Sequence, residues 1–219
     1  MVQVKRSYRS ALREAQARST RRAVIESAAQ LFAERGYIAT SIEDIAAASG
    51  VSRATVFTSV GGKPLLLKTA FDIAIVGNDE PVALPDTQRA RVVHQATDAH
   101  RYLALYAELV TEIGGRLGRI YEAVRVAAKT DADVSRVWEA HQSQRRQGAA
   151  NVVHGVQSRG NLREGLDSET AADIVWVLND PGMYHLLVHG RGWKPSRFQT
   201  WLARTMQEQL LGSSPSTPN

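Results

Sequence analysis

Cysteine is absent from the 219 residues, so neither a disulfide bond nor a thiolate-bound metal can stabilise this chain. The absence of disulfides suits a reducing compartment, and we expect a cytoplasmic protein. Long apolar runs are absent as well. No stretch of 18 residues is apolar throughout, and the N-terminal segment is cationic without the apolar core of a secretory signal. We therefore expect no membrane partner.

Motifs that mark common enzyme classes are also missing. No Gly-rich loop has the spacing that binds phosphate, and no Ser stands in the G-x-S-x-G turn of a nucleophile elbow. His185 and His189 are four residues apart, a spacing that can chelate a metal, but no Glu lies between them and no third ligand is evident. The sequence therefore predicts a protein that is not an enzyme and that holds neither a metal ion nor a cofactor.

Excess positive charge is missing from most of the chain and is concentrated at its beginning. Residues 1–68 contain 11 Lys and Arg against 5 Asp and Glu, whereas residues 69–219 contain 16 against 17, which gives +5 for the whole chain. Within the first 22 residues, seven cations are opposed by Glu14 alone. Such a basic arm can neutralise phosphates and release their counterions, which favours nucleic acid as a partner, although a basic end can also simply be solvated.

Residues 41–60, SIEDIAAASGVSRATVFTSV, predict two short helices joined by a tight turn. Ser41 and Asp44 have the spacing of a capping box, in which each side chain bonds the backbone of the other residue and a helix starts. The first helix is then expected over residues 42–49. Gly50 can adopt the left-handed backbone that ends it sharply.

The second short helix is expected over residues 53–59, with Ser52 as its cap. Its Val56 should point inward, so the remaining side chains face solvent. The residues expected to contact DNA from this helix are Arg53, Ala54, Thr55, Thr58 and Ser59. Arg53 can pair the two acceptors of guanine, and Ala54 can touch a thymine methyl. Alternatively, Arg53 is an ordinary exposed side chain.

Further contacts are expected with the DNA backbone. Thr40, Ser52, Tyr37 and Lys63 are placed near helix ends, where they can orient on phosphates. Packing of the Tyr37 ring against the preceding helix would explain that residue equally well. Arg21 and Arg22 belong to the basic arm and are expected to contact phosphates more than bases.

The segment RAVIESAAQLFAERGYIATSIEDIAAASGVSRATVFTSVGGKPLLLKTAFD resembles the DNA-binding domain of the TetR family of bacterial transcriptional regulators. The resemblance covers about residues 22–72. It implies a homodimer whose N-terminal helix-turn-helix binds a palindromic double-stranded DNA operator. It also implies a C-terminal domain that binds a small-molecule effector, still unknown here, which releases a repressor. Phe57 departs from the Tyr usual in the family, so a phosphate-binding hydroxyl is missing.

The expected fold is all-α, with an N-terminal three-helix helix-turn-helix domain and a C-terminal helical ligand-binding and dimerisation domain. Residues 1–15 are expected to be a disordered basic arm, 16–72 the DNA-binding domain, 86–212 the second domain and 213–219 a disordered tail. Gly and Pro interrupt the helical pattern over residues 77–85. Later helices are expected at residues 88–113, 115–129, 131–159, 168–178, 181–189 and 195–211.

Aromatic residues make up only 6% of the chain, and most of them lie in the expected second domain. A set that can line a ligand cavity is Tyr102, Tyr106, Tyr121, Trp138 and His141. A set that can form a dimer interface is Trp176, Tyr184, Leu187, Phe198 and Trp201. Both sets can equally be parts of an ordinary core.

Two other functions fit the same residues. The first is a helical small-molecule-binding protein or enzyme without specific DNA recognition, in which the basic arm is incidental. The second is a DNA-binding protein without ligand control.

Overall fold

A computed structural model describes residues 3–80, 82–118 and 120–211, with side chains from Leu12 onward, and every regular element in these ranges is helical. This confirms the all-α fold class. The chain divides into two compact units. Unit 1 comprises Met1–Ile73 with Arg119–Val137, and unit 2 comprises Ala74–Gly118 with Trp138–Asn219.

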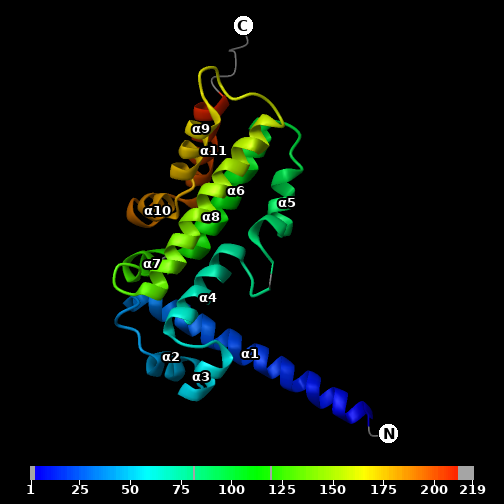
Figure 1. Cartoon of the computed structure of the whole chain (residues 1–219), viewed down its shortest axis with the longest axis vertical. Helices are drawn as coiled ribbons and strands as arrows, with labels where there is room; N and C mark the ends of the chain where they lie inside the picture. Colours follow the sequence, from blue (N-terminus) through cyan, green and yellow to red (C-terminus); the bar gives the residue numbers. More distant parts are fainter. Residues whose placement is uncertain (1–2, 81, 119, 212–219) are drawn as a thin grey trace. The chain divides into compact units, whose positions relative to one another are not determined.

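Unit 1 is built on four successive helices to which a later segment is added (Figure 1). Its elements are α1 (Gln3–Arg35), α2 (Ile42–Ser49), α3 (Arg53–Ser59), α7 (Ile120–Ala127), most of α4 (Lys63–Val76) and the first turns of α8 (Ala132–Gln157). The largest fully buried side chains of this unit are Phe32, Ile45, Leu66, Leu67 and Phe71. They come from α1, α2 and α4, so these three helices hold the core on which α3 rests.

The signals predicted around α2 are present. The Ser41 hydroxyl accepts a hydrogen bond from the Asp44 N–H at 3.1 Å, and the Ser41 N–H donates to the Asp44 carboxylate at 2.9 Å. Gly50 has φ +68°, a left-handed conformation that other residues rarely adopt. Both short helices therefore have the predicted bounds, and the turn between them is fixed locally.

The first helix is longer than expected. Residues 3–15 were expected to be a disordered arm, but α1 runs without interruption from Gln3 to Arg35. The physical reason lies in composition, because this range contains neither Gly nor Pro and is rich in Ala, Arg, Gln and Glu, which favour helix. The high charge alone was a misleading sign of disorder. The predicted tail over residues 213–219 lies outside the described residues.

Unit 2 contains the longer helices of the chain's second part (Figure 1). Its elements are η1 (Leu84–Asp86), α5 (Gln88–His94), α6 (Ala99–Leu117), the rest of α8, α9 (Ser168–Leu178), α10 (Pro181–Tyr184), the π-helical η2 (His185–Gly190) and α11 (Pro195–Leu211). α6 and α11 pack along each other, and their shared core includes Tyr102, Leu103, Phe198, Leu202 and Met206.

Several predicted helices are divided or shortened. The helix expected over residues 88–113 is broken because the Asp98 carboxylate accepts from the Arg101 N–H at 2.8 Å and starts a new helix, α6. The helix expected over 181–189 changes to a π-helical segment at His185, and that expected over 115–129 begins at Ile120. The bounds predicted for α9 and α11 are confirmed.

The expected second domain, residues 86–212, also needs correction. Residues 119–137 belong to unit 1, because the Tyr121 ring stacks on Phe71 with 6.5 Å between centroids and α7 packs on α1. Local sequence could not show this, since both partners look like ordinary core residues. Across the described residues, no helix combines the length and apolar character needed to cross a bilayer.

Candidate nucleic-acid interface

α3 is a short helix that buries one side chain and exposes most of the others. Val56 has no exposed surface and anchors the helix to the unit 1 core. The Ser52 hydroxyl caps it by accepting from the Thr55 N–H at 3.1 Å. The exposed residues on and beside the helix are Ser52, Arg53, Ala54, Phe57 and Thr58, while Thr55 and Ser59 are half-buried. The predicted contact residues of this helix therefore all retain access to solvent.

The hydroxyl groups of α3 are already engaged in local hydrogen bonds. Thr58 donates to the carbonyls of Ala54 and Thr55, at 3.1 and 3.2 Å, and Ser59 donates to the carbonyl of Val56 at 3.1 Å. Each oxygen keeps acceptor capacity for an incoming donor. These groups can therefore accept from a base amine, and must give up a local bond before they donate.

Arg53 forms an ion pair that the sequence did not reveal. Its guanidinium lies 2.8 Å from the Glu43 carboxylate of α2, and the two side chains are 64% and 60% exposed. The same guanidinium lies 6.0 Å from the centroid of the Phe57 ring. Such an exposed pair is weak, so Arg53 is held near the surface of α3 without being locked there.

Phe57 places an aromatic ring on the exposed side of α3, where it is 46% exposed. Ile38 and Leu65 of unit 1 are also large apolar residues with high exposure, 71% and 47%. An apolar ring on an exposed reading helix can contact the methyl group of thymine. It cannot form the phosphate hydrogen bond that a Tyr hydroxyl provides.

Two predicted phosphate contacts are wrong. Thr40 is buried, and its hydroxyl donates to the carbonyls of Gly36, at 2.8 Å, and Leu31, at 3.3 Å, which satisfies the end of α1. Tyr37 is also buried, and its hydroxyl donates to the Asp131 carboxylate at 2.8 Å. Both hydroxyls therefore stabilise unit 1 and cannot reach a phosphate.

The Tyr37 contact also affects the ionisation of both partners. Burial, together with the bond to Asp131, raises the pKa of the Tyr37 phenol well above its usual range. The same hydrogen bond lowers the pKa of the Asp131 carboxyl. The phenol therefore stays protonated, and the carboxyl stays ionised, at neutral pH.

Lys63 is half-buried at the start of α4. Its ammonium donates to the carbonyl of Ile38 at 3.4 Å and lies 4.3 Å from the centroid of the Tyr37 ring. Burial lowers the pKa of this ammonium. The Lys63 ammonium thus stabilises the loop after α1. A phosphate would have to compete with the Ile38 carbonyl and the Tyr37 ring for this ammonium.

The two predicted arginines of the arm have different surroundings. Arg21 donates from Nη1 to the carbonyl of Ser59 at 3.1 Å, which ties the middle of α1 to the end of α3. Arg22 is exposed and forms an ion pair with Glu26 at 2.7 Å. Arg13 and Arg18 are exposed as well.

The residues predicted to bind a ligand do not all lie in one place. Tyr121 belongs to unit 1, where it packs on Phe71, whereas the other four residues of the set belong to unit 2. Tyr102 is buried in the core against Gly155 of α8. Tyr106 accepts a hydrogen bond from the Asn179 amide at 2.8 Å, and burial raises the pKa of this phenol to about 12.

Trp138 and His141 are neighbours on α8, with 6.3 Å between ring centroids. Burial, and next the positive charge of Arg145, lowers the pKa of His141 to about 4. Arg145 itself is buried and pairs with Asp180 at 2.9 Å. It also donates to the Trp176 carbonyl at 2.6 Å and to the Asn179 side chain at 2.8 Å.

Sequence reasoning missed a polar cluster, which we call the buried polar cluster after its two buried members, His141 and Arg145, and which also includes the half-buried Asn179 and Asp180. Arg145 stands in a polar stretch, QSQRRQ, that reads as a solvated helix face. No local signal distinguishes a buried arginine there, because Gln142 is its one nearby partner and Trp176 and Asn179 follow more than 30 residues later.

Two predicted dimer contacts are also wrong. Phe198 has no exposed surface, and Tyr184 is 5% exposed and packs edge-on against it with 5.1 Å between centroids. Both therefore fill the core of one chain. Gly114 of α6 makes room for Tyr184, since a Cβ there would lie 2.6 Å from the ring.

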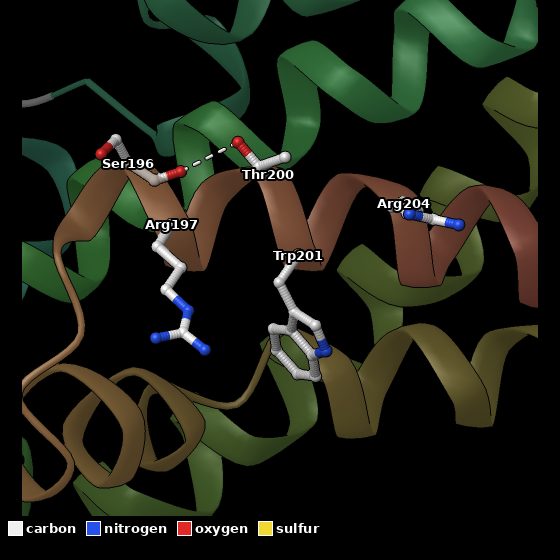
Figure 2. Close-up of a pocket in the computed structure, with 5 residues that line it drawn as sticks. All are labelled: Ser196, Arg197, Thr200, Trp201 and Arg204. Atoms are coloured by element: carbon white, nitrogen blue, oxygen red, sulfur yellow. Dashed lines mark hydrogen bonds between the residues drawn. The ribbon is translucent and has the colours of Figure 1, made fainter.

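The other three predicted dimer residues, Trp176, Leu187 and Trp201, are half-buried. Val177 and Leu186, which the prediction did not include, are 53% and 63% exposed. Figure 2 shows Arg197 and Trp201 on the same side of α11, where they line a shallow pocket with Ser196, Thr200 and Arg204.

Over the described part of the chain, no group of three or more His, Asp or Glu side chains is placed to hold an ion. The rings of His185 and His189 lie 5.4 Å apart.

Known proteins are similar to this chain both in the sequence around α3 and in the fold. Residues 24–68 match the family model described as bacterial regulatory proteins, tetR family. The uncharacterised HTH-type transcriptional regulator YdeS of Bacillus subtilis is 27% identical over 175 residues, which cover 78% of this chain and 80% of YdeS. The HTH-type transcriptional repressor Rv3405c of Mycobacterium tuberculosis is 38% identical over 78 residues, 36% of this chain and 40% of that protein.

A solved structure extends the likeness over most of the chain. A protein of Saccharomonospora viridis in complex with choline superposes with a TM-score of 0.68 at 21% identity, and the match covers 88% of this chain and 97% of the other. This structural likeness shows a shared fold. The sequence match to the family model over residues 24–68 includes both α2 and α3. Over residues 24–68 the chain is therefore similar to the bacterial regulatory proteins of the tetR family, and most of its length shares a fold with the Saccharomonospora viridis protein.

Proposed function

We propose that this chain is a repressor that binds a palindromic DNA operator as a homodimer and leaves it when a small molecule binds unit 2. The observation that carries the proposal is α3, which is capped at Ser52, anchored by Val56 and exposed along its outer side. In helix-turn-helix proteins the second helix lies in the major groove, with its N-terminal residues at the base edges.

Each exposed residue of α3 has a proposed role. Arg53 donates two hydrogen bonds to O6 and N7 of a guanine, the commonest specific contact in the major groove. Ala54 and Phe57 offer apolar contacts to thymine methyl groups. The hydroxyls of Thr55 and Thr58, with those of Ser52 and Ser59, accept from bases or lie against the backbone.

The proposed dimer face lies on α9, η2 and α11. It comprises the half-buried Trp176, Leu187 and Trp201 with the exposed Val177 and Leu186. Aromatic and aliphatic residues of this kind are enriched in the buried centre of protein interfaces. A two-fold dimer presents two copies of α3 to half-sites about one helical turn apart, which makes the operator palindromic.

The proposed effector site is in unit 2, near Tyr106, Trp138 and the buried polar cluster. Apolar walls with a few polar groups are typical of small-ligand sites between helices. The Saccharomonospora viridis protein was solved with choline, which supports a small-molecule effector for this fold. Effector binding is proposed to favour a dimer whose α3 helices no longer match successive major grooves.

Sequencing of the DNA fragments that the purified chain selects from a random pool tests the proposal. We expect a palindromic motif whose half-sites are spaced by about one helical turn. If no fragment is retained, or all are retained alike, the proposal fails. That result would favour the helical small-molecule-binding protein or enzyme without specific DNA recognition.

Ligand control is tested separately, with the selected operator in hand. Compounds that raise the melting temperature of unit 2 are added at saturation, and operator affinity is measured by fluorescence anisotropy. We expect at least one such compound to lower the affinity. If none does, the chain is a DNA-binding protein without ligand control.

A further inference from the structure

We propose that the N-terminal turns of α1 form a second DNA-contact surface, which lies along the duplex outside the half-site bound by α3. The inference rests on the proposed function, since it extends the contact made by the same unit. It concerns the part of α1 that precedes residues 24–68, the segment matched by the family model. The partner is double-stranded DNA, and the contact is to its phosphates.

The first observation is the exposure of this part of α1. Residues 12–19 are all exposed, including Leu12 at 58%. Figure 1 shows this end of α1 extending past α2 and α3 within unit 1. A helix without packing is only marginally stable in water, and a bound partner would stabilise it.

The second observation is charge. Residues 3–22 contain seven Lys and Arg and one acidic residue, Glu14. Arg13 and Arg18 are exposed on this stretch. A surface so rich in cations complements a polyanion, and the helix beside it, α3, is already proposed to lie in DNA.

The third observation fixes where the surface begins. Arg21 donates to the carbonyl of Ser59 at the end of α3. The basic turns of α1 therefore start next to the proposed reading helix and continue away from it. From Gln3 to Arg22 the helix rises about 25 to 30 Å, at ~1.5 Å per residue. That length corresponds to about 7 or 8 base pairs of flanking duplex.

The decisive experiment trims the DNA. Duplexes carrying the selected half-sites are prepared with flanks of decreasing length, and affinity is measured by fluorescence anisotropy over a range of salt concentrations. We expect affinity to fall as the flanks become shorter than about 7 base pairs, whatever their sequence. An affinity that does not change when the flanks are removed would overturn the inference. The proposed function would still stand in that case, because it rests on specific binding to the selected half-sites.

A double variant tests the residues themselves. Arg13→Gln combined with Arg18→Gln removes two exposed cations and should lower the slope of log affinity against log salt by about 2, at ~0.9 per phosphate contact. The corresponding loss of affinity on fully flanked DNA is about tenfold at physiological salt. On trimmed DNA, the variant and the wild type should bind alike.

The matched control removes the same charge elsewhere. Arg91→Gln with Arg101→Gln eliminates two exposed cations of unit 2. This control should leave the dependence on flank length unchanged. If it reduced the salt slope as much as the α1 variant did, net charge and not the α1 surface would be responsible, and the inference would fail. A wild-type chain that retained no DNA in the selection would remove the proposed function and this inference together.

Discussion

At the scale of single residues, DNA reading by α3 requires that a guanine compete with the Glu43 carboxylate for the Arg53 guanidinium. Its ion pair with Glu43 joins two side chains that are both at least 60% exposed, and such pairs contribute roughly 0–1 kcal/mol. A guanine offers two acceptors in the plane of the guanidinium and so competes effectively. The Glu43 carboxylate remains close by and repels any acceptor or phosphate that Arg53 does not neutralise.

Substitution of Arg53 therefore tests base reading. We predict that Arg53→Ala costs about 1–3 kcal/mol on the selected operator and relaxes the preference at one base pair. The measurement is competitive binding to operators that differ at single positions. A loss of equal size on every sequence would instead identify Arg53 as a backbone contact. Arg101→Ala, a change at an exposed residue of unit 2, serves as the control.

The sequence could identify residues whose side chains are exposed. It could not identify residues whose hydroxyls form hydrogen bonds within unit 1. The burial of Val56 and the exposure of Arg53 were predicted correctly because helical spacing alone decides inside and outside over seven residues, and Ser52 was predicted correctly as the cap. Thr40 and Tyr37 were misplaced because a hydroxyl reads the same whether it faces a phosphate or a partner within the chain. The partner of Tyr37, Asp131, is 94 positions away.

At the scale of elements, α8 contains two glycines with opposite surroundings. A Cβ at Gly155 would lie 2.4 Å from the hydroxyl oxygen of buried Tyr102, whereas a Cβ at Gly148 would meet nothing within 4 Å. The first glycine permits close packing between α8 and α6. The second has no such role, and only lowers the helix propensity of α8.

We predict opposite effects for the two alanine variants. Gly155→Ala should destabilise unit 2 by about 1–3 kcal/mol, because the new Cβ would overlap the buried Tyr102 side chain. Gly148→Ala should stabilise it by roughly 0.5–1 kcal/mol. All four tryptophans lie in unit 2, so denaturant unfolding followed by tryptophan fluorescence reports on this unit alone. Equal effects of the two variants would contradict the packing seen at Gly155.

The elements that sequence predicted well are those with local signals at both ends. α2 has its capping box and Gly50, and α9 and α11 have the expected bounds. The break before α6 was missed because Asp98 looks like any polar helix residue until its side chain turns back to cap. The α1 extension was missed because charge was weighed above helix propensity.

At the scale of the whole molecule, the buried polar cluster links the stability of unit 2 to pH. The lowered pKa of His141, about 4 against 6.5 for the free side chain, means that the unfolded chain binds a proton there before the folded chain does. The stabilising effect of the neutral ring is therefore complete above about pH 6.5 and is lost as pH falls toward 4.

We predict that the wild type loses about 2 kcal/mol of unfolding free energy between pH 7 and 5 through this histidine, at ~1.4 kcal/mol per pKa unit. In His141→Gln that part of the pH dependence should disappear. The test compares urea unfolding of the two proteins at both pH values by tryptophan fluorescence. Parallel pH profiles for wild type and variant would show that His141 is not the group that titrates.

Assembly is the second property of the whole molecule. We predict that Val177→Glu, at an exposed position of the proposed dimer face, halves the mass measured by light scattering and weakens operator binding by at least tenfold, since a buried unpaired charge is costly. Val126→Glu, at a similarly exposed valine of α7, should leave the mass unchanged. A monomeric wild type, or a dimer that Val177→Glu does not disturb, would remove this face from the proposed assembly.

The late partners of Tyr37 and Phe71 bear on how the protein is made. Asp131 and Tyr121 lie in the segment Arg119–Val137, which completes unit 1 from far along the chain. At about 5–20 residues per second, a ribosome releases α1 to α4 several seconds before that segment. During synthesis, the apolar surface of α1 to α4 that Tyr121 later covers at Phe71 is therefore exposed to solvent for several seconds. A fragment of the protein that ends after α4 would leave this apolar surface permanently exposed to solvent. A minimal version of unit 1 therefore has to include α7.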